Sequence, residues 1–236
     1  MEGQQINFDF IIKMCLRKKK VANIVVCDTV FVLGILATVF KARYEGGFLT
    51  CLREMTVDGT LFASLVACVF SIMNHFEIQQ DREVNSIPLY YLRLSSAVTE
   101  FIILLVVLIG YLPFVPDHPV INRFDMVNMH VIIPLLTLVS FVFHDAPIGK
   151  LSPLERFNGL IFIVLYSVAI MTCIATGIIA KNKIPYSFMN YYDNSIWYTL
   201  FAVVIIYLLG YLLSWMFSEL NRKASWLWLK DIVKKA

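Results

Sequence analysis

Six long apolar stretches constrain this chain more than any other feature of its sequence. A helix needs about 20 mostly apolar residues to cross the hydrocarbon core of a bilayer. Stretches of this kind lie at residues 21–40, 55–74, 89–114, 126–143, 160–180 and 197–217. They predict an all-α protein, an integral membrane bundle of six transmembrane helices that forms a single domain over residues 1–236.

Composition points the same way. Hydrophobic residues make up 59% of the 236 residues and charged residues 16%, against about 45–50% and about 25% in soluble domains. These values exclude a disordered chain, and the net charge of +3 is too small to indicate a nucleic-acid partner. The five cysteines are scattered, without metal-site spacing. We therefore interpret them as small core residues and expect neither a metal nor another cofactor.

The first apolar stretch has an alternative interpretation as a cleaved signal peptide, because Lys18, Lys19 and Lys20 precede it. Its apolar run is longer than a typical signal-peptide core, and no small-residue cleavage site follows it. We therefore expect a retained helix.

Basic residues predict the orientation of the bundle. Cytoplasmic loops of membrane proteins carry an excess of Lys and Arg, and an even number of spans places both termini on one side. The terminal segments are the most basic parts of the chain, which predicts a multi-pass protein with both termini in the cytoplasm. The residues concerned are Lys13, Arg17, Lys18, Lys19, Lys20, Arg222, Lys223, Lys230, Lys234 and Lys235.

The C-terminal segment 224–236 has the pattern of an interfacial amphipathic helix. Trp226, Leu229 and Val233 share one face, and Lys230 lies on another. Trp at the headgroup level with Lys beside it is typical of a membrane anchor. A solvated basic tail is the alternative interpretation.

Polar groups inside the predicted spans are the candidates for function, because ionisable side chains are costly in a membrane. They are Asp28, Asp58, Arg93, Glu100 and His130. In the second span, Thr56, Thr60 and Ser64 follow one another at helical spacing and form a polar stripe. Close packing between helices, which favours small residues in membranes, is the alternative explanation of that stripe.

The fourth span contains His130, followed by Pro134. Proline has no N–H, so the carbonyl of His130 loses its helical donor and we expect a kink at that turn. A hydrogen bond between helices is the alternative role for this histidine. With both termini cytoplasmic, Thr56 and His130 lie within about two turns of the outer interface. A Thr hydroxyl beside a neutral imidazole is a nucleophile–base pair, placed at the depth of lipid ester bonds.

These residues carry a resemblance to the androgen-induced membrane protein family. The family's threonine has a basic residue three positions earlier, as Arg53 precedes Thr56, and its histidine lies in a Met-His motif followed by apolar residues and proline, as in Met129, His130 and Pro134. The segment Pro185-Tyr186-Ser187-Phe188 is similar to a motif before the family's last span.

The resemblance implies a multispan hydrolase of fatty acid esters of hydroxy fatty acids or of similar lipid esters. It implies Thr56 as the nucleophile and His130 as the base, with a fatty-acyl ester as the substrate. Thr60 and Asn128 are candidate substrate-binding donors near the pair. This sequence departs from the family in having Glu54 and Met55, in place of an aromatic residue, before the threonine. Thr50, just after a Gly-Gly pair, is the alternative nucleophile.

Two other functions stay open at this point. Glu100, Arg93 and Asp28 could line the polar pathway of a small transporter or channel. Glu100 and Arg93 lie on one helical face and could equally form a buried ion pair. A non-catalytic receptor or lipid-binding membrane protein with an outer pocket is the remaining alternative.

Overall fold

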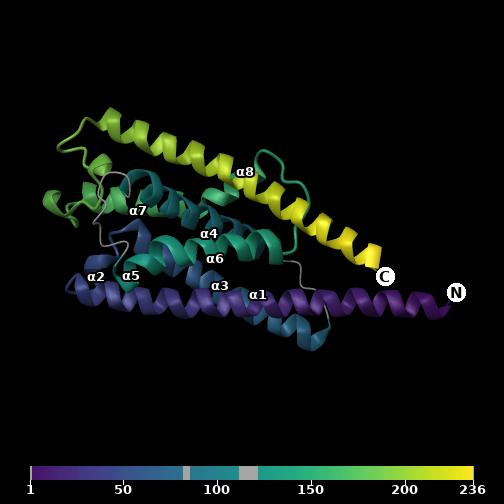
Figure 1. The fold of residues 1–236 in the computed structure, drawn as a ribbon. Helices are drawn as coiled ribbons and strands as arrows, with labels where there is room; N and C mark the ends of the chain where they lie inside the picture. The colour runs from purple at the N-terminus through teal and green to yellow at the C-terminus, as the bar shows by residue number, and fades with distance from the viewer. Residues whose placement is uncertain (1, 82–85, 112–121, 236) are drawn as a thin grey trace.

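A computed structural model describes residues 2–81, 86–111 and 122–235 of the chain as a bundle of helices (Figure 1). Six helical segments are long and apolar enough to cross a membrane, and the described residues contain no β-strand. The predicted all-α bundle with six spans is therefore confirmed. The six segments are Ile12–Tyr44, Met55–Gln80, Ile87–Ile109, Phe124–His144, Glu155–Ala175 and Ile196–Ile232.

Three spans are each formed largely by one α-helix. The helices are α1 (Glu2–Tyr44), α3 (Met55–Gln80) and α8 (Ile196–Lys235), and a short helix α2 (Phe48–Cys51) links the first two. Both α1 and α8 are longer than the predicted spans, because the hydropathy pattern marks only their apolar parts. Residues 224–235 are helical and continue α8 without a break, and the interfacial position expected for this tail stays a prediction.

The other three spans are composite. The third consists of α4 (Ile87–Leu105) and the π-helical η1 (Val106–Tyr111), and its predicted end at residue 114 falls outside the described residues. The fourth runs through α5 (Phe124–Val127), η2 (Asn128–Ile132), α6 (Ile133–Val139) and η3 (Ser140–His144). The fifth consists of η4 (Glu155–Leu160) and α7 (Ile161–Ala175). Short 3₁₀ turns η5 (Lys181–Lys183) and η6 (Ser187–Met189) precede α8.

The fifth span ends at Ala175, five residues before the predicted residue 180. The physical reason is Gly177, whose φ of 77° is a left-handed conformation that glycine adopts readily. The N–H of Ile179 then bonds the carbonyl of Cys173, which closes the helix. The apolar residues Ile178 and Ile179, which extended the predicted span, belong to the turn that follows.

Helix α4 forms the centre of the bundle, and α8 lies at its edge. In the most apolar part of the third span 67% of the residues are buried, whereas in that of the last span 22% are buried. Small residues allow neighbouring helices to approach α4 closely. A Cβ added to Gly59 of α3 would lie 2.9 Å from Cδ1 of Ile103 in α4, so a side chain at this crossing would have to displace the end of Ile103.

The two termini lie at the same end of the bundle, as the even number of spans predicts (Figure 1). Helices α2 and α5 lie at the opposite end. We call these the terminal end and the loop end of the bundle.

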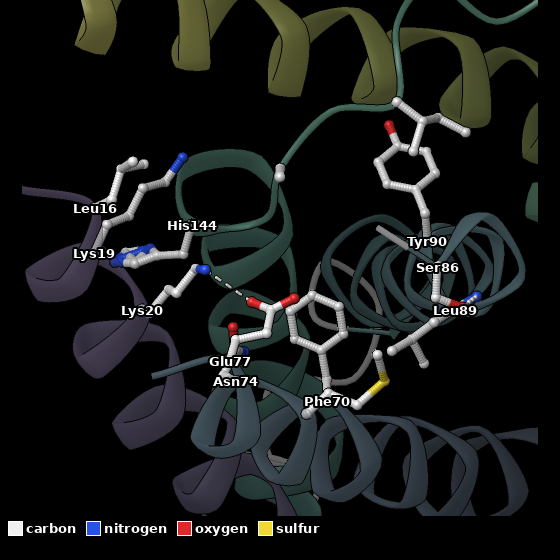
Figure 2. Close-up of a pocket in the computed structure, with 13 residues that line it drawn as sticks. Leu16, Lys19, Lys20, Phe70, Asn74, Glu77, Ser86, Leu89, Tyr90 and His144 are labelled. Atoms are coloured by element: carbon white, nitrogen blue, oxygen red, sulfur yellow. Dashed lines mark hydrogen bonds and ion pairs between the residues drawn. The ribbon is translucent and has the colours of Figure 1, made fainter. Parts of the chain in front are cut away.

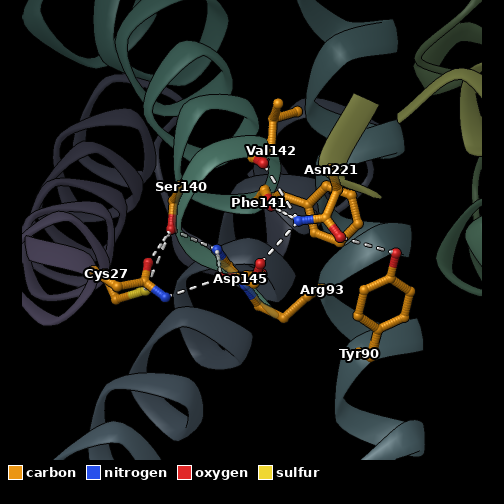
Figure 3. A network of polar contacts seen from close by, with 9 residues as sticks. Cys27, Tyr90, Arg93, Ser140, Phe141, Val142, Asp145 and Asn221 are labelled. Carbon is orange, nitrogen blue, oxygen red and sulfur yellow. Dashed lines mark hydrogen bonds and ion pairs between the residues drawn. The ribbon is translucent and has the colours of Figure 1, made fainter. Parts of the chain in front are cut away.

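At the terminal end, a buried polar network connects four helical segments (Figure 3). The Arg93 Nε donates to the Asp145 carboxylate at 2.9 Å, and both side chains are 1% exposed. Asn23 of α1 donates to the same carboxylate, and Ser140 of η3 accepts from Arg93. Asn221 of α8 donates to the backbone carbonyl of Asp145 at 2.9 Å. The network thereby ties α1, α4, η3 and α8 together.

Candidate functional site

Thr56 lies in the first turn of α3, at the loop end, and the segment before it is held in place by distant residues. The Tyr166 hydroxyl of α7 donates to the carbonyl of Arg53 at 2.7 Å. The Arg53 guanidinium donates to the carbonyl of Lys183 at 3.1 Å. Lys41 of α1 forms an ion pair with Glu54 at 3.1 Å. Contacts from three sides thus fix where α3 begins.

Tyr186 is the residue that touches Thr56 from outside its own helix. Its hydroxyl accepts a hydrogen bond from the Met55 N–H at 2.9 Å and lies beside the Thr56 side chain. Burial, followed by the nearby Glu54 carboxylate, raises the pKa of Tyr186 above its ordinary value. The phenol therefore stays protonated at neutral pH and keeps a proton to donate.

From the sequence, Tyr186 is identified only as part of a motif before the last span and has no assigned role. It lies 131 positions from Met55, the residue whose N–H it accepts. No local pattern carries such a contact. An aromatic residue next to Pro185, in a segment rich in Tyr and Phe, was the only signal available.

His130 lies in η2, a π-helical turn of the fourth span. Pro134 follows in the first turn of α6 and cannot donate to the His130 carbonyl, and the kink expected at this turn stays a prediction. π-Helical turns inside helices are frequent at functional sites. His130 is buried, with 8% of its surface exposed.

The hydrogen bonding of His130 assigns its tautomer. Nδ1 lies 2.8 Å from the carbonyl oxygen of Met126, which can only accept, so Nδ1 carries the proton. In the neutral form of the ring, Nε2 is then the basic nitrogen. A general base requires this neutral form.

The two motifs pack against one another at the loop end. Val57, next to Thr56, and Met129, next to His130, belong to one buried cluster with Ala37 and Cys51. The contact between α3 and η2 therefore brings together the segments of Thr56 and His130, which are 74 positions apart in sequence. The reaction between the two side chains stays a prediction.

The candidate substrate-binding residues lie nearby with different degrees of engagement. Thr60 is fully buried, and its hydroxyl has no hydrogen-bond partner among the described residues. One amide hydrogen of Asn128 bonds the carbonyl of Phe124 at 2.7 Å. Thr50, the alternative nucleophile, lies in α2 rather than in a span, and its carbonyl accepts from Arg53.

The structure places the three residues considered for a transport pathway in different surroundings. Arg93 pairs with Asp145 and not with Glu100, so the ion pair considered between Arg93 and Glu100 is wrong. Asp28 accepts from Ser71 at 2.6 Å. Glu100 is fully buried, and its carboxylate oxygens have no hydrogen-bond partner among the described residues. No hydrogen bond or ion pair among the described residues joins these three side chains to one another, and a transport pathway stays an untested alternative.

Two hollows that the structure describes lie at the terminal end of the bundle, and Figure 2 shows the first of them. One is lined by residues of α1, α3, α4 and the end of η3, and the other by residues of α1, η3 and α8. The cavity expected beside Thr56, Thr60 and His130 stays a prediction. Within the described part of the chain, no group of three or more His, Cys, Asp or Glu side chains could hold a metal ion.

Comparison with known proteins finds no protein-family model, no curated protein and no solved structure that matches this chain. The family resemblance of the short motifs therefore remains a hypothesis from sequence.

Proposed function

We propose that this protein is an intramembrane hydrolase of lipid esters that uses Thr56 as nucleophile and His130 as base. The observation that carries the proposal is the packing of Val57 against the Met129 cluster, which joins the two motifs at one end of the bundle. The protonated Nδ1 of His130 supports it further, because it leaves Nε2 as the basic nitrogen. The proposed orientation, with both termini in the cytoplasm, puts this end at the outer leaflet.

In this mechanism the Thr56 hydroxyl attacks the acyl carbonyl carbon while His130 Nε2 takes its proton. The tetrahedral intermediate then expels the alkoxide of the ester, which receives that proton from the imidazolium. Water, deprotonated by His130, hydrolyses the acyl–threonine bond and regenerates the free hydroxyl. Tyr186, whose hydroxyl accepts from the Met55 N–H beside the Thr56 side chain, positions the nucleophile in this scheme.

The test is hydrolysis of a panel of lipid esters by the purified chain, together with labelling by a fluorophosphonate probe. Thr56→Ala and His130→Ala should each lower turnover by about 10³-fold or more, and the double variant should be scarcely worse, because the two residues act as a unit. Thr56→Ser should keep part of the activity.

Two matched controls are present in the chain. His75 bonds the carbonyl four residues earlier, as His130 does, but lies at the other end of α3, so His75→Ala should leave turnover unchanged. Thr50→Ala should likewise be nearly neutral. An inactive Thr50→Ala with an active Thr56→Ala would move the nucleophile to Thr50. A wild-type protein that cleaves no ester and takes up no probe would refute the hydrolase proposal.

A further inference from the structure

A cavity at the terminal end, far from Thr56, has the features of a binding site for an anion. It has a volume of about 100 Å³, enough for a group of several non-hydrogen atoms, since a water molecule occupies about 30 Å³ of liquid. Figure 2 shows Lys19, Lys20 and His144 on one side and Phe70, Leu89 and Tyr90 on the other. The cavity is thus cationic on one wall and apolar on the opposite wall.

Two polar side-chain atoms in the cavity wall have no hydrogen-bond partner among the described residues. Asn74 is 6% exposed, lines the cavity, and its Nδ2 amide has no hydrogen-bond partner among the described residues. The Nδ1 of His144, which lines the same cavity, is also buried without a partner in that part of the chain. Buried polar groups without a hydrogen-bond partner are unfavourable. Asn74 Nδ2 can only donate, so its missing partner is an acceptor.

The charges around the cavity leave one cation over. Lys20 forms an ion pair with Glu77 at 3.0 Å, and the Asp145 carboxylate is held by Arg93 at 2.9 Å. Lys19 has no carboxylate within ion-pair distance among the described residues, and its ammonium lies 5.1 Å from the centre of the Trp228 ring. The ammonium of Lys19 therefore lacks an anionic partner, and the amide of Asn74 lacks an acceptor. A negatively charged acceptor would satisfy both.

The second hollow adjoins the first and indicates what the anion is attached to. It is a wider, open groove of about 440 Å³ that shares Lys19 and His144 with the cavity. Phe143, Ala224 and Trp228 supply an apolar wall. A Trp side chain beside lysines is typical of the headgroup region of a bilayer. A ligand that fits both hollows has an anionic group of a few atoms joined to a less polar part.

We propose that this cavity binds a phosphate group, supplied by the headgroup of an anionic phospholipid. Lys19 provides the charge, Asn74 Nδ2 and His144 provide hydrogen bonds to the phosphate oxygens, and the groove beside Trp228 takes the glycerol part of the lipid. Basic pockets between helices at the membrane surface recognise lipid headgroups in this way. The site is separate from the proposed hydrolase site and does not depend on it.

The experiment measures binding of dioctanoyl phosphatidic acid to the purified full-length protein in detergent by native mass spectrometry. Dioctanoyl phosphatidylcholine and inorganic phosphate form the comparison arms. Lys19→Gln and Asn74→Leu should each weaken phosphatidic acid binding by about tenfold, as expected for the loss of one charge-assisted hydrogen bond. Lys19→Arg should restore binding. Arg17→Gln removes the same charge from an exposed position two residues earlier and should leave binding unchanged.

The arms separate the two sources of phosphate. Binding of phosphatidic acid that inorganic phosphate does not displace supports a lipid ligand. Binding of inorganic phosphate, lost in Lys19→Gln, with none of the lipid supports the cavity but assigns it to a soluble phosphate compound. If Asn74→Leu does not fold, Lys19→Gln and its rescue decide alone. Equal binding by wild type and Lys19→Gln, or an equal loss in Arg17→Gln, would overturn the proposal.

Discussion

Tyr186 shows how a single hydroxyl can connect two distant parts of the chain. It accepts from the Met55 N–H, a backbone donor at the start of α3 that has no partner within the helix. The same oxygen lies beside the Thr56 side chain. One side chain therefore caps the helix next to the proposed nucleophile, and we expect it to orient that nucleophile.

We expect Tyr186→Phe to fold and to lose about 10- to 100-fold in kcat for ester hydrolysis, because the ring remains while the hydroxyl that orients Thr56 is lost. KM should change much less. A matched control is Tyr192→Phe, whose hydroxyl bonds the carbonyl of Ile174 and should have no effect on turnover.

The pH profile provides an independent readout. Burial raises the pKa of Tyr186, so the phenol of the folded protein stays protonated beyond the ordinary tyrosine value of about 10. The stability that this group contributes is complete below the unfolded value and is lost as the pH rises through the folded value. We therefore expect Tyr186→Phe to lower turnover already at neutral pH. A loss of turnover that appears only above pH 10 would contradict the positioning role.

The apolar stretches could be predicted as helices because that signal is local, whereas the contacts within the site could not. Arg93 shows the limit of local signals. Helical spacing places Glu100 on the same face as Arg93 and suggests an ion pair, but the structure pairs Arg93 with Asp145, 52 residues away. Likewise, no spacing rule brings Tyr186 to Thr56. Long-range partners depend on how helices pack, and hydropathy alone does not determine the packing.

At the scale of elements, the crossing of α3 and α4 depends on the absence of a side chain at Gly59. A methyl group there would come within 2.9 Å of Ile103 Cδ1 and 3.1 Å of Thr99 Cγ2. We expect Gly59→Ala to destabilise the protein by about 1–3 kcal/mol through overpacking. Thermal unfolding in detergent measures the change.

A second substitution tests the cause directly. Ile103→Val removes the Cδ1 methyl, so the double variant Gly59→Ala with Ile103→Val should recover part of the lost stability. Additive losses in the double variant would show that the close approach of these two residues is not the reason.

Over the whole molecule, the network around Arg93 and Asp145 holds α1, α4, η3 and α8 in one arrangement. Arg93→Met would leave the Asp145 carboxylate buried without its counter-charge, and we expect a loss of about 3–5 kcal/mol. The exposed pair of Arg222 with Glu219 supplies the control, and Arg222→Met should cost less than about 1 kcal/mol. Similar losses in the two variants, measured by thermal unfolding, would argue against a structural role for the buried pair.

The orientation is also a property of the whole molecule. Cysteines introduced by Lys183→Cys at the loop end and Lys223→Cys at the terminal end are both at exposed positions. A thiol reagent that does not cross membranes, added to intact cells, should label the first and not the second, above the background of the native cysteines. Labelling of Lys223→Cys from outside would reverse the orientation and remove Thr56 from the outer leaflet.

The length of α1 and α8 has a consequence for the shape that the molecule presents to its surroundings. Helix α8 has 40 residues, which at 1.5 Å per residue gives about 60 Å, twice the roughly 30 Å of the hydrocarbon core. Helix α1, with 43 residues, is longer still. The surplus of both helices lies at the terminal end (Figure 1). The molecule is therefore asymmetric across the bilayer, with two helices that extend beyond the other spans on one side.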